Sequence, residues 1–329
     1  MYLTGFESSA GTVIITPERA VLLIDFRYFE KAKATVKHLE VILAVKTAEQ
    51  MKEIFAKEEI SLIYVETDRI NLESYKGLCK ALLNITVSKK AKLSNEILKL
   101  RSVKSLQEIE SIKQAQSLTD KAFEHILDFI KSGKTEKEIM LEMEFFIRKS
   151  GSQGVSFDFI VVSGKKSSLP HGVPAEKKVE NGDFITMDFG AVVSGYRSDM
   201  TRTVALGYAD DEMREVYNTV LLAQTEALKA IKPNVKCKDI DKIARDIIAN
   251  KGYGECFGHG LGHSVGLEIH ESPSFNTRDN TLLKEGMVLT VEPGIYIEDK
   301  FGVRIEDMVY ITDNSYDNLT ASPKELIIL

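Results

Sequence analysis

The feature that most constrains the fold of this chain is an internal repeat in its C-terminal half. Residues 182–190 align with residues 286–294, an offset of 104 residues, and a glycine begins and ends each copy. Between the glycines, Thr186 and Asp188 correspond to Thr290 and Glu292, and an apolar run precedes both acids. The period is too long, and the copies are too few, for a solenoid. The repeat therefore predicts a duplicated domain with pseudo-two-fold symmetry.

Each copy has the pattern of a β-hairpin that brings two acids to one face. In the first copy, pairing Asp188 with Asp199 centres the turn between residues 193 and 194. In the second copy, Glu292 pairs with Glu306. Directly opposed residues in a hairpin point to the same face, with Cβ atoms about 5 Å apart. We therefore expect two pairs of carboxylates, which the pseudo-symmetry brings together.

Four carboxylates this close to one another repel. At an effective dielectric of about 20, each pair of charges 4 Å apart costs roughly 4 kcal/mol. The group must be protonated, separated or neutralised, and two divalent cations would cancel four negative charges. Oxygen-rich ligation favours Mn, and one imidazole ligand would extend the choice to Fe, Co or Zn.

Candidate imidazoles lie in the glycine-rich segment 258–271, which contains His259, His263 and His270, and His171 lies in a Pro-His-Gly sequence upstream. The glycines favour a loop or bulged strand over a helix. The segment lacks the ending of a phosphate loop and the HExxH pattern of zincins. A histidine in such a loop is more often a local hydrogen-bonding residue than a ligand, and a lone acid near a turn is usually solvated. The two acid pairs and the histidine-rich segment together favour a metal site over these separate explanations.

Composition excludes several classes of protein. The net charge of −6 is unfavourable for sequence-independent nucleic-acid binding, which needs a basic surface. No apolar run approaches 18 residues, so we expect no membrane span. The three cysteines are odd in number and show no CxxC spacing. Together with an N-terminus that lacks a secretory signal, they indicate a reducing, cytoplasmic location.

The chain also divides into two parts. Residues 1–103 alternate short strand-like and helix-like runs, typical of a small α/β domain, and end in a charged connector at about 89–104. Residues 104–329 begin with two amphipathic helices, each preceded by a capping-box sequence, at 105–108 and 135–138. Two further helices are predicted at 212–231 and 239–250. The predicted fold class is therefore α/β (α+β), with domains at 1–103 and 104–329.

These motifs, in this order, resemble those of the pita-bread metallopeptidase family. The resemblance spans roughly residues 105–329 and is strongest to the Xaa-Pro dipeptidase (prolidase) and aminopeptidase P branch. It rests on the sequences around His171, Asp188, Asp199, the 262–271 segment and the 291–307 segment. Residues 1–103 resemble the family's creatinase-like N-terminal domain more loosely. Met1 aligns with an internal family segment, so this domain is expected to be shortened at its N-terminus.

The resemblance implies a dinuclear metal site and assigns a role to each residue. Two divalent ions, expected to be Mn, with Co, Fe or Zn as alternatives, would share a bridging hydroxide that attacks the bond before proline. Glu292 would also move the proton of the attacking water, His270 would stabilise the tetrahedral intermediate, and Arg304 would organise the site and substrate. His171 and His259 would bind substrate or shuttle protons. The implied metal ligands are Asp188, Asp199, His263, Glu292 and Glu306.

The expected activity is hydrolysis of Xaa-Pro bonds in short proline-containing peptides by a cytoplasmic homodimer, with no nucleic-acid or membrane partner. An Xaa-Pro aminopeptidase that acts on longer peptides is the alternative within the same class. C–N hydrolysis of a non-peptide substrate, as in creatinase, is disfavoured because all five implied ligands are present. From another class, the alternative is a metal-free pita-bread protein that binds peptides without cleaving them.

Overall fold

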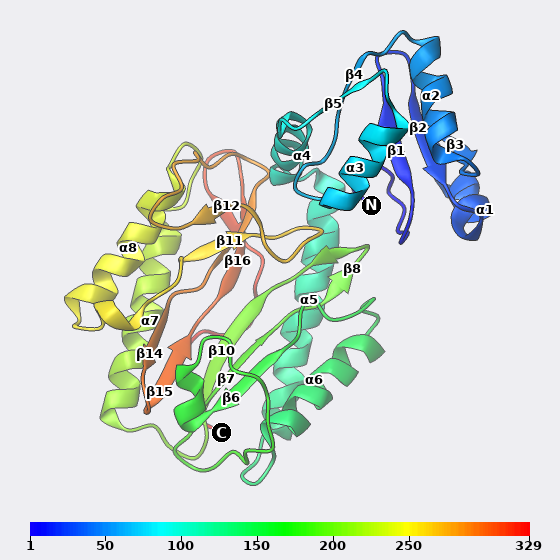
Figure 1. Cartoon of the computed structure of the whole chain (residues 1–329). Coiled ribbons are helices and arrows are strands. Elements are labelled where there is room, and N and C mark those ends of the chain that lie inside the picture. The colour runs from blue at the N-terminus through cyan, green and yellow to red at the C-terminus, as the bar shows by residue number, and fades with distance from the viewer. The chain divides into compact units, whose positions relative to one another are not determined.

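A computed structural model describes all residues, 1–329, and divides them into two compact units, Met1–Arg101 and Ser102–Leu329. Both units mix helices and strands (Figure 1). None of the helices combines the length and the apolar character that crossing a bilayer requires.

The first unit is built on a three-stranded sheet in the order β1-β2-β3. The central strand β2 buries alternate residues on opposite faces, which is the period of a strand. Val21 and Leu23 pack with α2, and Leu22 and Ile24 pack with α1. Both faces are therefore covered, as the alternating pattern predicts for an α/β layer. The elements are β1 (Thr12–Ile15), β2 (Ala20–Ile24), α1 (Phe26–Thr35), β3 (Glu40–Leu43), α2 (Thr47–Lys57), β4 (Leu62–Tyr64), α3 (Leu72–Ala81) and β5 (Thr86–Ser88).

The charged connector differs from the sequence prediction. Most of it forms a helix, α4 (Lys92–Ser102), which carries apolar Leu93, Ile97 and Leu100 among its charged residues. Their spacing of three to four residues is the helical period. The high charge density of the segment masked this periodicity, which is why the sequence suggested only a connector.

The second unit begins with the two helices that the capping boxes predict. Ser105 caps α5 (Leu106–Phe129) and Thr135 caps α6 (Glu136–Lys149), and in both cases the reciprocal glutamate bond is present. Gly151, with a φ of 103°, follows the end of α6. The unit continues through β6 (Ile160–Ser163), η1 (Gly164–Ser168), β7 (Phe184–Phe189), β8 (Val192–Val193), β9 (Tyr196–Arg197) and β10 (Met200–Ala205).

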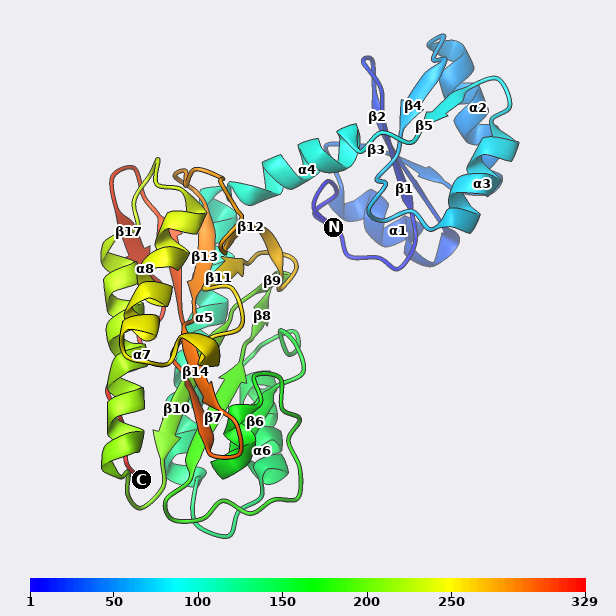
Figure 2. The ribbon, with the colours of Figure 1, turned by 60° about the vertical axis from the view of Figure 1, so that its left-hand side comes forward.

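The remaining elements repeat this plan. Two more helices, α7 and α8, lie side by side in both views of the ribbon (Figure 2). In sequence order, the elements are α7 (Asp211–Lys229), α8 (Cys237–Asn250), η2 (Gly254–Cys256), β11 (Gly262–Ser264), β12 (Glu271–Phe275), β13 (Val288–Val291), β14 (Gly294–Ile297), β15 (Phe301–Arg304), β16 (Asp307–Ile311) and β17 (Tyr316–Asn318). The three strands β6-β7-β10 of the first half correspond to β11-β13-β16 of the second, and two helices precede each set. This is the predicted duplicated domain.

Alternate side chains of the central strands in this unit point into the core, and the residues between them point to a polar face. In β7, Ile185, Met187 and Phe189 pack in a cluster with α5 and α6. In β13, Leu289 and Val291 pack in a cluster with α7 and α8. The intervening residues point away from the helices, because successive side chains of a strand alternate between faces. Asp188 lies on this second face of β7, and Glu292 directly follows β13.

Candidate metal centre

The first hairpin brings Asp188 and Asp199 to the site, but in a different register from the predicted one. β7 and β10 pair so that Asp188 lies opposite Thr201, and the predicted pairing of Asp188 with Asp199 is wrong. The turn explains the difference, because Ser194 and Gly195 have φ values of 51° and 80° and form its two central residues. A shift of two residues leaves a side chain on the same face of a hairpin. Asp199 therefore still reaches the same site as Asp188.

The second hairpin has the predicted register. Val291 lies opposite Asp307, and the same register continues through β14 and β15. Glu292 and Glu306 consequently face each other in the short irregular segment between the two strand pairs. Both carboxylates leave the backbone where the ladder is interrupted.

Hydrogen bonds between Thr201 and Glu306 connect the two hairpins next to the acids. The backbone N–H of Glu306 donates to the carbonyl of Thr201 at 3.1 Å, and the Thr201 hydroxyl donates to Glu306 Oε2 at 2.7 Å. Arg304 Nε in turn donates to the same hydroxyl oxygen at 2.9 Å. These bonds link the two halves of the duplication and fix one oxygen of Glu306.

Three carboxylates form the centre of the cluster. One oxygen from each of Asp188, Asp199 and Glu306 lies within 4.8 Å of the other two. Asp188 Oδ1 and Glu306 Oε1 are buried and accept no hydrogen bond from the protein. A buried oxygen without a partner is costly, so these two atoms point to a ligand that the protein itself does not supply.

His263 and Glu292 complete the predicted set at the edge of this cluster. His263 Nε2 lies 3.6 Å from Asp199 Oδ2 and 3.4 Å from Glu292 Oε1. The Thr290 hydroxyl accepts the backbone N–H of His263 at 3.0 Å and donates to Glu292 Oε1 at 3.1 Å. The threonine of the repeat thus links the backbone of His263 to the carboxylate of Glu292.

Burial shifts the pKa values in this site strongly. Burial, followed by the charges of neighbouring carboxylates, raises the pKa of Asp199 and of Glu306 well above the usual carboxyl range. Burial also raises the pKa of Glu292 and lowers that of His263. Without a cation, burial therefore favours the protonated forms of Asp199, Glu292 and Glu306 and the neutral imidazole of His263. A divalent cation would reverse this preference for the acids and would bind the neutral ring.

The donor set fits divalent metal ions. It offers carboxylate oxygens, two of them without a hydrogen bond, and one neutral imidazole nitrogen. Oxygen-rich sites with one imidazole suit Mn, Fe, Co and Zn.

A chain of hydrogen bonds leads from the acids to His259. Arg304 is buried, and its Nη2 donates to Asp188 Oδ2 at 2.6 Å while its Nη1 donates to the Tyr296 hydroxyl at 2.8 Å. The same hydroxyl lies 2.9 Å from His259 Nε2. Burial raises the pKa of Tyr296 to about 12 and lowers that of His259. The phenol therefore keeps its proton and donates a hydrogen bond to Nε2 of the neutral His259 ring.

A cavity of about 960 Å³ opens over the cluster. All nine residues that the sequence singled out line it, namely the five predicted ligands and His171, His259, His270 and Arg304. The rings of His263 and His270 meet edge to face, with centroids 4.4 Å apart. The structure thus brings together residues from four separate segments of the chain.

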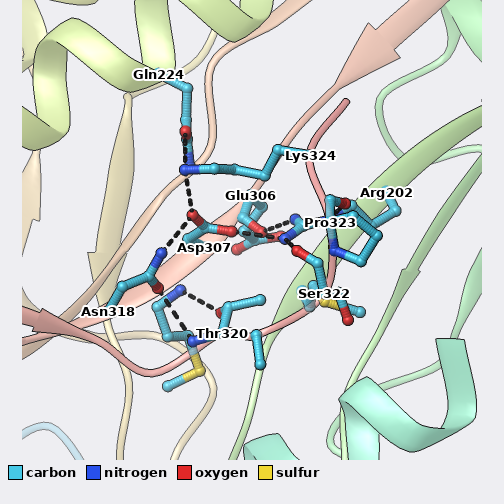
Figure 3. A network of polar contacts seen from close by, with 12 residues as sticks. Arg202, Gln224, Glu306, Asp307, Asn318, Thr320, Ser322, Pro323 and Lys324 are labelled. Atoms are coloured by element: carbon cyan, nitrogen blue, oxygen red, sulfur yellow. Dashed lines mark hydrogen bonds and ion pairs between the residues drawn. The ribbon is translucent and has the colours of Figure 1, made fainter. Parts of the chain in front are cut away.

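A buried ion pair between Arg202 and Asp307 lies next to the backbone of Glu306 in the second hairpin (Figure 3). Arg202 and Asp307 are both almost fully buried, and Arg202 Nη2 donates to Asp307 Oδ1 at 2.7 Å. Arg202 Nη1 also donates to the carbonyl of Glu306, and Lys324 lies 3.0 Å from the other oxygen of Asp307. The backbone of Glu306 is therefore held by a charged network on the side away from the cavity.

Sequence reasoning missed three residues of the site. Tyr296, Thr201 and Thr290 received no role. For Thr290, the signal was available, because it is the threonine that recurs in both copies of the repeat. No comparable local pattern marks Thr201 or Tyr296, since their partners lie across the hairpin or in the other half of the unit.

Comparison with known proteins identifies the family. The profile described as "Metallopeptidase family M24" matches residues 110–313, more than half of the chain. This chain belongs to metallopeptidase family M24. The profile described as "Creatinase/Prolidase N-terminal domain" matches residues 1–103. The resemblance inferred from the sequence motifs is confirmed, and so is the pita-bread fold of the second unit.

Several family M24 proteins are similar over almost the whole chain. The Xaa-Pro dipeptidase of Pyrococcus furiosus is 40% identical over 320 residues, which are 96% of this chain and 89% of that protein. The structure of a Xaa-Pro dipeptidase from Bacillus anthracis has a TM-score of 0.96 and 43% identity, and the match covers 100% of this chain and 92% of that one. The X-Pro aminopeptidase from Thermotoga maritima has a TM-score of 0.93 and 39% identity, covering 100% and 93%.

Proposed function

We propose that this chain is a metal-dependent exopeptidase that hydrolyses Xaa-Pro bonds, with Xaa-Pro dipeptides as substrates. The observation that carries the proposal is the cluster of three carboxylates with two unpartnered buried oxygens, lying at the base of a large cavity. Such a cluster is costly unless cations neutralise it. The similarity to two Xaa-Pro dipeptidases over nearly the full length supports the choice of substrate.

The proposed ligands of two divalent ions are Asp188, Asp199, His263, Glu292 and Glu306. Asp199 and Glu306 are proposed to serve both ions, and one oxygen of each lies within 4.8 Å of the other and of Asp188. When bound, two such ions would lower the pKa of a water and polarise the peptide carbonyl. We propose Mn as the native metal, because most of the donors are carboxylate oxygens.

The chain's own groups would handle the proton and the substrate. Glu292, buried and with its pKa raised by burial, is proposed to accept a proton from the attacking water and to deliver it to the leaving nitrogen. His270 lies beside His263 in the cavity and is proposed to stabilise the tetrahedral intermediate. His171 and His259 are proposed to bind substrate or move protons, and Arg304 to keep Asp188 in place.

A second activity, aminopeptidase cleavage of longer peptides, is favoured by one observation. Binding pockets are usually about 300–1,000 Å³, and this cavity of about 960 Å³ lies near the upper limit. The similarity to the Thermotoga maritima X-Pro aminopeptidase agrees with this alternative. A longer peptide would place the same Xaa-Pro bond over the acids.

The remaining proposals concern the state of the protein. The cysteines Cys79, Cys237 and Cys256 form no disulfides, which agrees with the proposed cytoplasmic location. We propose residues 1–103 and 104–329 as the functional domains and a homodimer as the assembly.

One experiment tests the function and separates its alternatives. The purified protein is stripped with a chelator, reloaded with Mn or Co, and assayed on Ala-Pro, Ala-Pro-Ala and Ala-Ala. We expect cleavage of Ala-Pro that the chelator abolishes and the metal restores. Faster cleavage of Ala-Pro-Ala would favour the aminopeptidase. Turnover that survives complete metal removal, or no cleavage of either proline peptide by metal-loaded protein, would reject the proposal.

A further inference from the structure

The segment that carries His171 lines part of the cavity. This segment, residues 164–175, is called the His171 strap. It leaves β6 through η1, and residues 170–174 line the cavity. The carbonyl of Pro170 accepts a hydrogen bond from Arg304 Nη1 at 3.2 Å, so the strap also touches the residue that holds Asp188.

The backbone of the strap carries the imidazole of His171 into the cavity. This ring is exposed and takes part in none of the side-chain hydrogen bonds of the structure. It lines the same cavity as His259 and His270, and its charged form would lower the pKa of both. The contacts that hold the strap therefore set the position of the His171 imidazole.

Glu136 holds both ends. It is fully buried in the first turn of α6. Its Oε1 accepts the backbone N–H of Ser163 at 2.8 Å and the Ser163 hydroxyl at 3.0 Å, just before the strap begins. Its Oε2 accepts the backbone N–H of Ala175 at 3.1 Å, at the end of the strap, and the ammonium of Lys166 at 2.8 Å, inside it.

We propose that Glu136 is the positioning residue for His171: one buried carboxylate closes the strap and thereby places the imidazole over the metal centre. This rests on the proposed function, in which His171 meets the substrate. Glu136 touches no substrate itself. Because the ring itself makes no hydrogen bond, a displaced strap would misplace it, and a displacement of about 1 Å can cost roughly 100-fold in rate.

Glutamine at position 136 has nearly the same shape as glutamate, but it cannot accept all the hydrogen bonds that the Glu136 carboxylate accepts. A carboxylate accepts with both oxygens, whereas an amide has one acceptor and one donor group. With its NH₂ toward Ala175, the side chain faces two donors, the Ala175 N–H and Lys166. In the flipped orientation, it faces the N–H of Ser163. Either orientation breaks the hydrogen bond of Glu136 at one end of the strap.

The test is a double-mutant cycle on the metal-loaded enzyme with Ala-Pro as substrate. We expect Glu136→Gln to lower kcat/KM at least about tenfold, at unchanged metal content. In the His171→Ala background, we expect the same substitution to change kcat/KM less than twofold. Glu138→Gln is the matched control, because Glu138 lies in the same helical turn and glutamine also completes its capping box, and it should behave as wild type.

A second variant and a second readout keep the test decisive if Glu136→Gln folds poorly. Lys166 is about a quarter exposed, so we expect the protein to tolerate Lys166→Met more readily. This change should lower kcat/KM by a smaller factor than Glu136→Gln does. The imidazole C–H resonance of His171, assigned with His171→Ala in the metal-free protein, should shift in Glu136→Gln while that of His125 does not.

Three results would overturn the proposal. These are an equal loss of activity in both backgrounds, no effect of His171→Ala on activity, or an unmoved His171 resonance. If the wild type cleaves no proline peptide at all, the proposed function fails, and the resonance still decides whether Glu136 positions the ring.

Discussion

Replacement of Asp199 by asparagine should have opposite effects on stability with and without metal. In the metal-free protein, Asp199 is a buried acid whose oxygen lies within 4.8 Å of those of Asp188 and Glu306. Asparagine has nearly the same shape and removes the charge. We therefore expect Asp199→Asn to stabilise the metal-free protein and to weaken its response to metal.

The magnitudes follow from the distances in the site. Two charges 4.8 Å apart at an effective dielectric of 20 repel by about 3.5 kcal/mol, and protonation relieves part of this. We expect Asp199→Asn to be about 1–3 kcal/mol more stable than wild type in chelator at pH 8. At a metal concentration of about 1,000 times Kd, wild type should gain about 4 kcal/mol, and each tenfold weaker affinity removes about 1.4 kcal/mol.

The pH dependence has a defined sign. Burial and neighbouring charges raise the pKa of Asp199, so its folded form binds a proton more readily than its unfolded form does. The stability that this group contributes is fully present below its unfolded pKa, near 3.8, and is lost as pH rises through the raised folded value. The advantage of Asp199→Asn in chelator should therefore grow between pH 5 and pH 8.

Urea unfolding followed by far-UV circular dichroism is the assay, because the chain has no tryptophan. Each variant is measured in chelator and in excess Mn. Asp246→Asn, in an exposed ion pair with Lys242, is the matched control and should respond to metal as wild type does. The reasoning is refuted if metal stabilises Asp199→Asn as much as wild type and the variant is the less stable protein in chelator.

Two further predictions concern the surroundings of the acids. Arg202→Met leaves Asp307 buried without its guanidinium and should destabilise the protein by about 3–5 kcal/mol in urea unfolding; a loss below about 1 kcal/mol would contradict the role of this pair. Tyr296→Phe removes the hydroxyl between Arg304 and His259 and should lower kcat/KM for Ala-Pro about tenfold or more at unchanged metal content; an unaltered kcat/KM would show that this chain of bonds is dispensable.

The sequence predicted the parts of the fold that local patterns control. Ser105 and Thr135 cap their helices as expected, because a capping box involves only residues three apart. The register of the first hairpin was missed by two residues, because Ser194 and Gly195 both adopt positive φ, and the acid pattern alone does not specify the turn. The error did not displace the site, since a shift of two residues preserves the face.

The site itself was only partly visible in the sequence. The acids could be listed because the repeated hairpins mark them, and the glycine-rich segment and a Pro-His-Gly sequence mark the histidines. Thr201, Arg202 and Glu136 could not, because each acts on residues more than 25 positions away or in the other half of the unit. Such contacts depend on how strands and loops meet in space, which no local spacing records.

The most direct test of the account is the number of metal ions that each chain binds. Chelator-treated protein is titrated with Mn in a calorimeter, and the metal retained after desalting is measured by atomic spectrometry. The account predicts two ions per chain for wild type and a loss of at least one of them for Glu306→Gln. A stoichiometry of one or none in wild type, or full retention in Glu306→Gln, would contradict the dinuclear centre.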